Sequence, residues 1–158
     1  MAIAFIIALG LMTVFFADVE SRQYNPNPSP DSTISDTHAQ VNLKRNRQGH
    51  YVATGLINRK SADFLLDTGA TDVVIPMDLA DHLNLRRGQP GRAMTANGPV
   101  TVYSTSIDEL SIGDIKLYNV PASINPGMSD QAILLGMSAL RQIEFVQRGD
   151  SLTLRQLY

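Results

Sequence analysis

The stretch Phe64-Leu65-Leu66-Asp67-Thr68-Gly69-Ala70-Thr71 predicts a buried strand that runs into a tight turn carrying one carboxylate. A second apolar run follows at residues 73–75. Burying an ionisable group between two apolar segments is costly unless the group is paired or hydrogen-bonded. Asp67 is therefore either a turn-former or a working acid. Asp-Thr-Gly is good turn chemistry by itself, because Asp bonds its own backbone and Gly accepts a positive φ.

A partner motif lies in the second half of the chain. It is the apolar strand Ile133-Leu134-Leu135, which ends in Gly136 and is followed by the helix-like Met137-Ser138-Ala139-Leu140. Together the two motifs resemble the retropepsin-like aspartic proteases, the single-domain relatives of retroviral protease. The resemblance covers residues 49–145. It implies a mostly β fold, a closed or partly open β-barrel with a flap hairpin and one short helix, as one half of a homodimeric protease.

Composition narrows the partners of this chain. Its 158 residues suit one domain plus an extension. The net charge is −2 and no Lys/Arg cluster is present, so nucleic acid is not an expected partner. The absence of cysteine excludes disulfides and thiolate metal sites, and the three histidines are scattered. We expect no metal, and the implied mechanism needs no cofactor because it uses only water.

Residues 2–17 form an uncharged apolar run. As a helix this run is about 24 Å long, short of a bilayer core of about 30 Å, which suits a signal-peptide core or a short anchor. Phe15 at the −3 position is unfavourable for cleavage after Ala17. We expect an uncleaved single-pass anchor over residues 1–20, and a buried core helix is the alternative.

A proline-containing polar segment over residues 21–38 is typical of a semi-rigid linker. Strand signals then follow to the end of the chain, including alternation at Val41 and Leu43 and a terminal hairpin over residues 143–154. We expect the protease domain to span residues 39–158. The resemblance places it at the bacterial inner membrane, facing the periplasm.

Residues 92–95 and 100–103 flank the sequence Ala96-Asn97-Gly98-Pro99. Asn-Gly between two β-prone runs predicts a hairpin. The resemblance makes this hairpin the flap that closes over substrate, with Ala96, Asn97 and Gly98 as substrate-binding residues. An ordinary hairpin is the alternative.

Aspartic proteases use two carboxylates with a water between them, one ionised as general base and one protonated. Like charges about 3 Å apart cannot both ionise, so the pair holds one proton. The chain has one Asp-Thr-Gly motif, so the resemblance implies a symmetric homodimer. By motif position, the site comprises catalytic Asp67, Thr68, which bonds across the dimer axis, Gly69, which lets the backbone approach substrate, and the cleft-lining residues Ala70, Thr71 and Asp72.

One departure from the retroviral pattern concerns an ion pair. Retroviral enzymes commonly carry an Asp at the position of Thr71 and a partner Arg at the position of Met137. Both charges are absent here together, so neither is left unpaired. This fits the bacterial membrane-anchored relatives better than the viral ones.

The sequence thus predicts a membrane-tethered aspartic endopeptidase that hydrolyses peptide bonds of a protein or peptide substrate, with its dyad formed across a homodimer. A catalytically silent dimer of the same fold, which binds extended peptides by strand addition, is the alternative. A third possibility is an anchored structural β-domain without a cleft, which a strictly monomeric protein would support.

Overall fold

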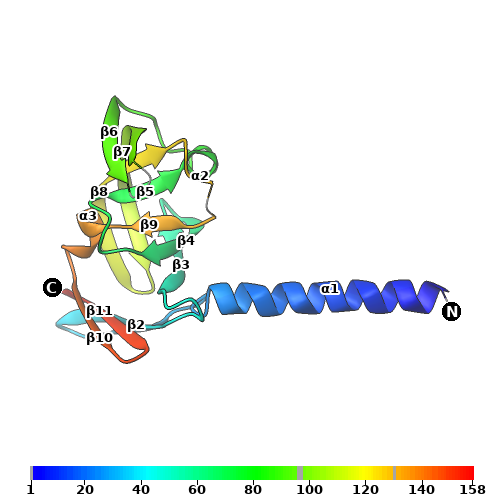
Figure 1. Cartoon of the computed structure of the whole chain (residues 1–158). Helices are drawn as coiled ribbons and strands as arrows, with labels where there is room; N and C mark the ends of the chain where they lie inside the picture. Colours follow the sequence, from blue (N-terminus) through cyan, green and yellow to red (C-terminus); the bar gives the residue numbers. More distant parts are fainter. Residues whose placement is uncertain (1, 96–97, 130) are drawn as a thin grey trace.

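The computed structural model describes residues 2–95, 98–129 and 131–158, and it consists of a long N-terminal helix and a mostly β body (Figure 1). The helices of this described part are α1 (Ala2–Tyr24), α2 (Met77–His82) and α3 (Met137–Leu140). Its strands are β1 (Asp31–Ile34), β2 (His38–Lys44), β3 (Val52–Ile57), β4 (Lys60–Leu66), β5 (Val73–Pro76), β6 (Pro90–Thr95), β7 (Gly98–Ile112), β8 (Ile115–Asn125), β9 (Ile133–Leu135), β10 (Glu144–Arg148) and β11 (Ser151–Leu157). The mostly β prediction is confirmed, but the described body has two short helices where the fold prediction has one. The second is a single turn that follows Gly136.

Among the described residues, seven strands form one sheet that curls into a ring. Their order is β3-β4-β9-β5-β8-β7-β6, and β3 also pairs with β7. This closing contact joins Leu56 to Ser111 and Ile57 to Leu110. β6 continues the sheet beyond the ring by pairing with β7 in a hairpin. The ring therefore carries the predicted hairpin as an outward extension.

Aliphatic side chains fill the inside of the ring, because alternate residues of a strand point to opposite faces. The body's largest fully buried side chains, including those of the second sheet, are Phe64, Leu43, Ile57, Ile75, Ile107, Leu110, Ile115, Ile124, Ile133, Leu135, Leu140 and Leu154. Each such side chain contributes about 1.5–3 kcal/mol by leaving water. Both apolar runs of the sequence, residues 64–66 and 73–75, thus contribute strands to one core.

In the part of the chain that the structure describes, four more strands form a second sheet in the order β1-β2-β11-β10. β2 buries Ala39, Val41 and Leu43 and directs the residues between them outward, as the alternation predicts. The predicted terminal hairpin is confirmed as β10 and β11, whose turn contains Gly149 at φ +58°. β10 lies at one edge of the sheet, and all five of its residues are exposed.

α1 projects away from the body (Figure 1). Its large apolar side chains between Ile3 and Phe16 are more than half exposed, from 56% at Leu9 and Met12 to 76% at Ile3. The alternative of a buried core helix is therefore wrong. By length and composition, residues 3–24 form a helix that can cross a membrane, and a signal sequence near an N-terminus has the same properties.

The segment 21–38, for which the sequence predicts a linker, carries structure of its own. α1 continues to Tyr24, and β1 adds a strand to the second sheet. Between them lie two buried asparagines, Asn25 and Asn27, and a third, Asn46, lies beside them in the loop after β2. We call these three residues the asparagine clamp.

The asparagine clamp holds the segment after α1 on the β body mainly through hydrogen bonds of its side-chain amides. Asn27 donates to the carbonyl oxygens of Lys44 and Val52 at 2.9 and 2.7 Å, and its side-chain oxygen accepts the Lys44 amide at 2.7 Å. Asn25 donates to the Asp63 carboxylate at 3.1 Å. An amide side chain offers a donor and an acceptor, as a peptide group does. A segment poor in apolar residues is thereby docked on β2, β3 and β4.

Candidate active site

The Asp67 turn begins where β4 ends. β4 and β9 run in parallel, with Leu66 paired to Leu135, and the Asp67 amide donates to the Leu135 carbonyl oxygen at 3.1 Å. The Gly69 amide donates to Asp67 Oδ1 at 2.9 Å, and the Ala70 amide donates to the Asp67 carbonyl oxygen at 3.2 Å. The carboxylate is thus oriented by the backbone of its own turn.

Gly136 lies directly against the loop that follows Asp67. A Cβ at this position would stand 2.1 Å from the Asp72 carbonyl oxygen and 2.7 Å from that of Ala70. The Met137 amide donates to the Ala70 carbonyl oxygen at 2.9 Å. The prediction that residues 133–136 pack under the Asp67 turn is confirmed. The glycine is required by close approach rather than by conformation, because its φ is −89°.

The turn remains open on its other side. Asp67 is partly exposed, and Thr68 and Gly69 are exposed. Of the predicted cleft-lining residues, Thr71 is exposed and Ala70 and Asp72 are partly exposed. The structure therefore gathers all six predicted residues of this group, 67–72, in one solvent-facing loop. One chain presents one Asp-Thr-Gly turn, whereas a carboxylate dyad, with one general acid and one general base, requires two carboxylates.

The predicted hairpin is present as β6 and β7. Thr95 pairs with Gly98, which has φ +103°, and the Thr95 hydroxyl donates to the Gly98 carbonyl oxygen at 2.8 Å. Ala96 and Asn97 lie outside the described residues. Figure 1 shows the hairpin at one end of the body, opposite the β10–β11 hairpin.

Sequence reasoning missed Ser138. This residue follows Met137, one of the two positions where the retroviral ion pair is absent. It is 3% exposed, and its amide donates to the Thr71 carbonyl oxygen at 2.9 Å. Thr71 is thus joined through main-chain groups to the residue that follows Met137. A serine within the apolar run of residues 133–140 was the available signal, and it is a weak one.

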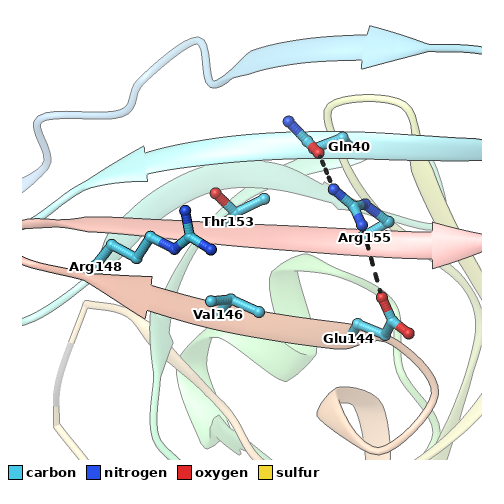
Figure 2. A pocket seen from close by; sticks show the side chains of 6 residues that line it. All are labelled: Gln40, Glu144, Val146, Arg148, Thr153 and Arg155. Atoms are coloured by element: carbon cyan, nitrogen blue, oxygen red, sulfur yellow. Dashed lines mark hydrogen bonds and ion pairs between the residues drawn. The ribbon is translucent and has the colours of Figure 1, made fainter.

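Two cavities lie away from the Asp67 turn, and none of the residues 67–72 lines them. One of about 300 Å³ lies on the outer face of the second sheet, where Arg155 donates to Gln40 at 2.9 Å and lies 4.0 Å from Glu144 (Figure 2). The other, of about 910 Å³, lies beside the C-terminal end of α1 and is lined in part by Asp63 and Gln131. Among the described residues, no group of three or more His, Cys, Asp or Glu could hold a metal ion.

Residues 53–142, more than half of the chain, match the family described as "gag-polyprotein putative aspartyl protease". The chain belongs to the retropepsin-like aspartic protease family. The matched residues of this retropepsin-like chain include the Asp67 turn, the β6–β7 hairpin and Gly136. They leave out α1, the asparagines at its end and the β10–β11 hairpin.

Two further comparisons extend beyond the matched residues. A crystal structure of a retropepsin-like aspartic protease from Rickettsia conorii has a TM-score of 0.64 with 22% identity, covering 82% of this chain and 95% of that chain. An "Uncharacterized protein in cobV 5′ region" from Sinorhizobium sp. is 33% identical over 135 residues, or 81% of this chain. The chain spans 58% of the length of that relative. The structural likeness shows that the retropepsin-like fold extends over most of the chain.

Proposed function

We propose that this chain is one half of a homodimeric aspartic endopeptidase, in which Asp67 from each of two copies forms the catalytic dyad. The observation that carries the proposal is the Asp67 turn itself. Gly136 and the end of β9 hold its backbone from below, while the carboxylate side remains open to solvent. A single fixed and accessible carboxylate is what half of a dyad requires.

The proposed chemistry is hydrolysis of a peptide bond. The ionised Asp67 takes a proton from the bound water, whose oxygen attacks the scissile carbonyl carbon. The protonated Asp67 of the second copy donates a hydrogen bond to the carbonyl oxygen, on which negative charge develops. Collapse of the tetrahedral intermediate breaks the C–N bond, and the leaving nitrogen takes up the proton held by the dyad. The Gly69 amide supports Asp67 through its bond to Oδ1.

The neighbouring residues have supporting roles in this proposal. The exposed Thr68 hydroxyl bonds to the second copy across the two-fold axis. Ala70, Thr71 and Asp72 line the cleft beside the substrate backbone, and the β6–β7 hairpin closes over the substrate with Gly98 near its tip. The substrate is an extended segment of a protein or peptide, which fits the strand-lined surroundings of the turn.

β10 offers a contact for the second copy. It is an edge strand of five exposed residues, with Phe145 39% and Val146 50% exposed. An unpaired strand edge with apolar side chains is a template for pairing with another chain. In the dimer we place β10 of each copy at the interface, in line with closed two-fold symmetry.

We further propose that α1 anchors the enzyme as a single-pass helix in a bacterial inner membrane, with the body in the periplasm. The exposed apolar surface of α1 supports this proposal. Residues 1–20 then form the anchor, 21–38 the connection and 39–158 the protease domain. Confinement to a membrane raises the effective concentration of one copy for another. Protease protection of the body in intact spheroplasts would contradict this orientation.

The test of the activity is cleavage of a peptide library between pH 4 and 7 by the full chain in detergent. The full chain is needed because truncation at residue 38 removes β1 and two clamp asparagines. Asp67→Asn is expected to lower cleavage by at least about a thousandfold, because an amide cannot serve as general base. The matched control is Asp108→Asn, an exposed carboxylate on β7 that should leave cleavage unchanged. Equal cleavage by the parent and Asp67→Asn would refute the proposal.

A mixing experiment tests whether the dyad is shared between copies. An excess of Asp67→Asn chains recruits parent chains into mixed pairs, each of which has one carboxylate. A roughly ninefold excess should reduce cleavage per parent chain by about tenfold if pairing is random. Undiminished cleavage would place the whole site in one chain. A dimer that is silent in every form would favour the peptide-binding alternative.

A further inference from the structure

We propose that Ser138 is a positioning residue for the Asp67 loop, and this inference rests on the function proposed above. Its hydroxyl accepts a hydrogen bond from the Val73 amide at 2.9 Å and donates one to the Pro121 carbonyl oxygen at 2.8 Å. Its own amide donates to the Thr71 carbonyl oxygen at 2.9 Å. One buried residue therefore connects α3 with the loop, with β5 and with β8.

The hydroxyl occupies a defined place between two strands. β5 and β8 run in parallel, and their first paired residues are Val73 and Ala122. Ser138 Oγ stands between the amide of Val73 and the carbonyl oxygen of Pro121, the residue before Ala122. The hydroxyl thus bridges the two strands at the point where the β5–β8 ladder begins. The bond from the Val73 amide is buried, and a buried main-chain group that loses its partner is costly.

At this end the loop is also restrained by the bond from the Ser138 amide to the Thr71 carbonyl oxygen, which a side-chain substitution leaves in place. Residues 67–72 connect β4 to β5 without regular structure. The Asp67 amide is held by Leu135 where the loop begins, and the Val73 amide is held by Ser138 where it ends. The Asp67 carboxylate takes its direction from this backbone through the Gly69 amide. Loss of the hydroxyl frees the Val73 amide at the far end of the loop and loosens the spacing of the proposed dyad.

The predicted effect is on the chemical step. A misplacement of about 1 Å in a catalytic group can cost about 100-fold in rate. Ser138→Ala is expected to lower kcat by about 10- to 100-fold. The KM should stay within about twofold, because the hydroxyl is buried and does not face substrate. Faster amide exchange over residues 67–75 should accompany the loss of kcat.

The matched control is Ser111→Ala. Ser111 is also buried, at 5% exposure, and the structure gives its hydroxyl no hydrogen bond among the described residues. This variant removes the same atom and should leave kcat and loop exchange unchanged. If Ser138→Ala behaves like Ser111→Ala in both measurements, the positioning role is refuted.

A second variant separates hydrogen bonding from volume. Ser138→Cys fills nearly the same space with a weaker donor and acceptor, so its kcat should lie between those of the parent and of Ser138→Ala. It also keeps the test decisive if the alanine variant does not fold. Parent-like kcat and loop exchange in Ser138→Cys would show that volume, not the hydroxyl, matters. If parent and Asp67→Asn both lack activity, the proposed function fails while amide exchange still reports on the loop.

Discussion

Two segments without regular structure are docked on the β body of this chain, and they are held by opposite means. The loop of residues 67–72 is held largely by main-chain bonds, among them those from Asp67 to Leu135 and from Met137 to Ala70. The chain after α1 is held largely by the side-chain amides of the asparagine clamp. Main-chain bonds use the peptide groups that are common to almost all residues, whereas the clamp uses side-chain amides that few residue types have.

The two sets of hydrogen bonds are therefore weakened by different substitutions. Main-chain bonding across the Asp67 loop requires close approach, so its sensitive position is the one residue that must lack a side chain, Gly136. Side-chain bonding in the clamp requires a particular amide at a particular place, and Asn27 with its three bonds is the sensitive position. A substitution at each position tests the contrast directly.

The largest effect on stability is expected for Gly136→Ala. The new Cβ would fall 2.1 Å from the Asp72 carbonyl oxygen, a main-chain atom that cannot rotate away. The loop must move, and we expect the free energy of unfolding to drop by about 3–5 kcal/mol. Urea denaturation of the full chain, followed by circular dichroism, measures the drop.

Gly91→Ala is the matched control for Gly136→Ala. Gly91 lies in β6, and a Cβ there would meet no atom within 4 Å. Its effect should stay below about 1 kcal/mol. Equal unfolding free energies for the two variants would show that the loop relaxes freely, and main-chain packing would then not be what holds it.

A smaller effect is expected for Asn27→Ala. The substitution leaves the buried carbonyl oxygen of Val52, and the partly buried amide and carbonyl oxygen of Lys44, without their side-chain partner. We expect a loss of about 2–4 kcal/mol, together with proteolytic cleavage within residues 25–34. Urea denaturation measures the loss of stability, and limited proteolysis measures cleavage within residues 25–34.

Asn42→Ala provides the comparison for Asn27→Ala. Asn42 lies partly buried on the outer face of β2 and accepts one bond from the Thr153 hydroxyl at 3.0 Å. Its loss should cost less than about 1 kcal/mol and leave residues 25–34 resistant. Resistance of the Asn27 variant as well would mean that β1, not the clamp, holds this segment.

The contrast also explains what could be predicted from the sequence. The Asp67 turn was predictable because its flanking apolar runs and its glycine leave a local pattern, and the same holds for Gly136 after its apolar strand. Gly98 and Gly149 likewise mark the two hairpins, since each has a positive φ. Local chemistry determines all of these features, so a sequence window contains the signal.

The missed features depend on contacts between distant residues. Asn27 is predicted to lie in a linker because its neighbours are prolines and polar residues, and nothing local indicates Lys44 as its partner. Ring closure between Ile57 and Leu110 and the bridging hydroxyl of Ser138 depend on the finished fold in the same way. Local patterns indicate strands and turns, whereas these partners are set by three-dimensional proximity.

The smallest effect is expected for an ion pair at the surface. Arg87 contacts both carboxylate oxygens of Asp81 at 2.8 and 2.9 Å, distances like those made by Asn27. The two side chains are 46% and 59% exposed, so water replaces the bond when it is lost. Arg87→Ala should change the free energy of unfolding by no more than about 0.5 kcal/mol. A loss as large as that of Asn27→Ala would mean that bond length, and not burial, determines what a polar contact contributes in this protein.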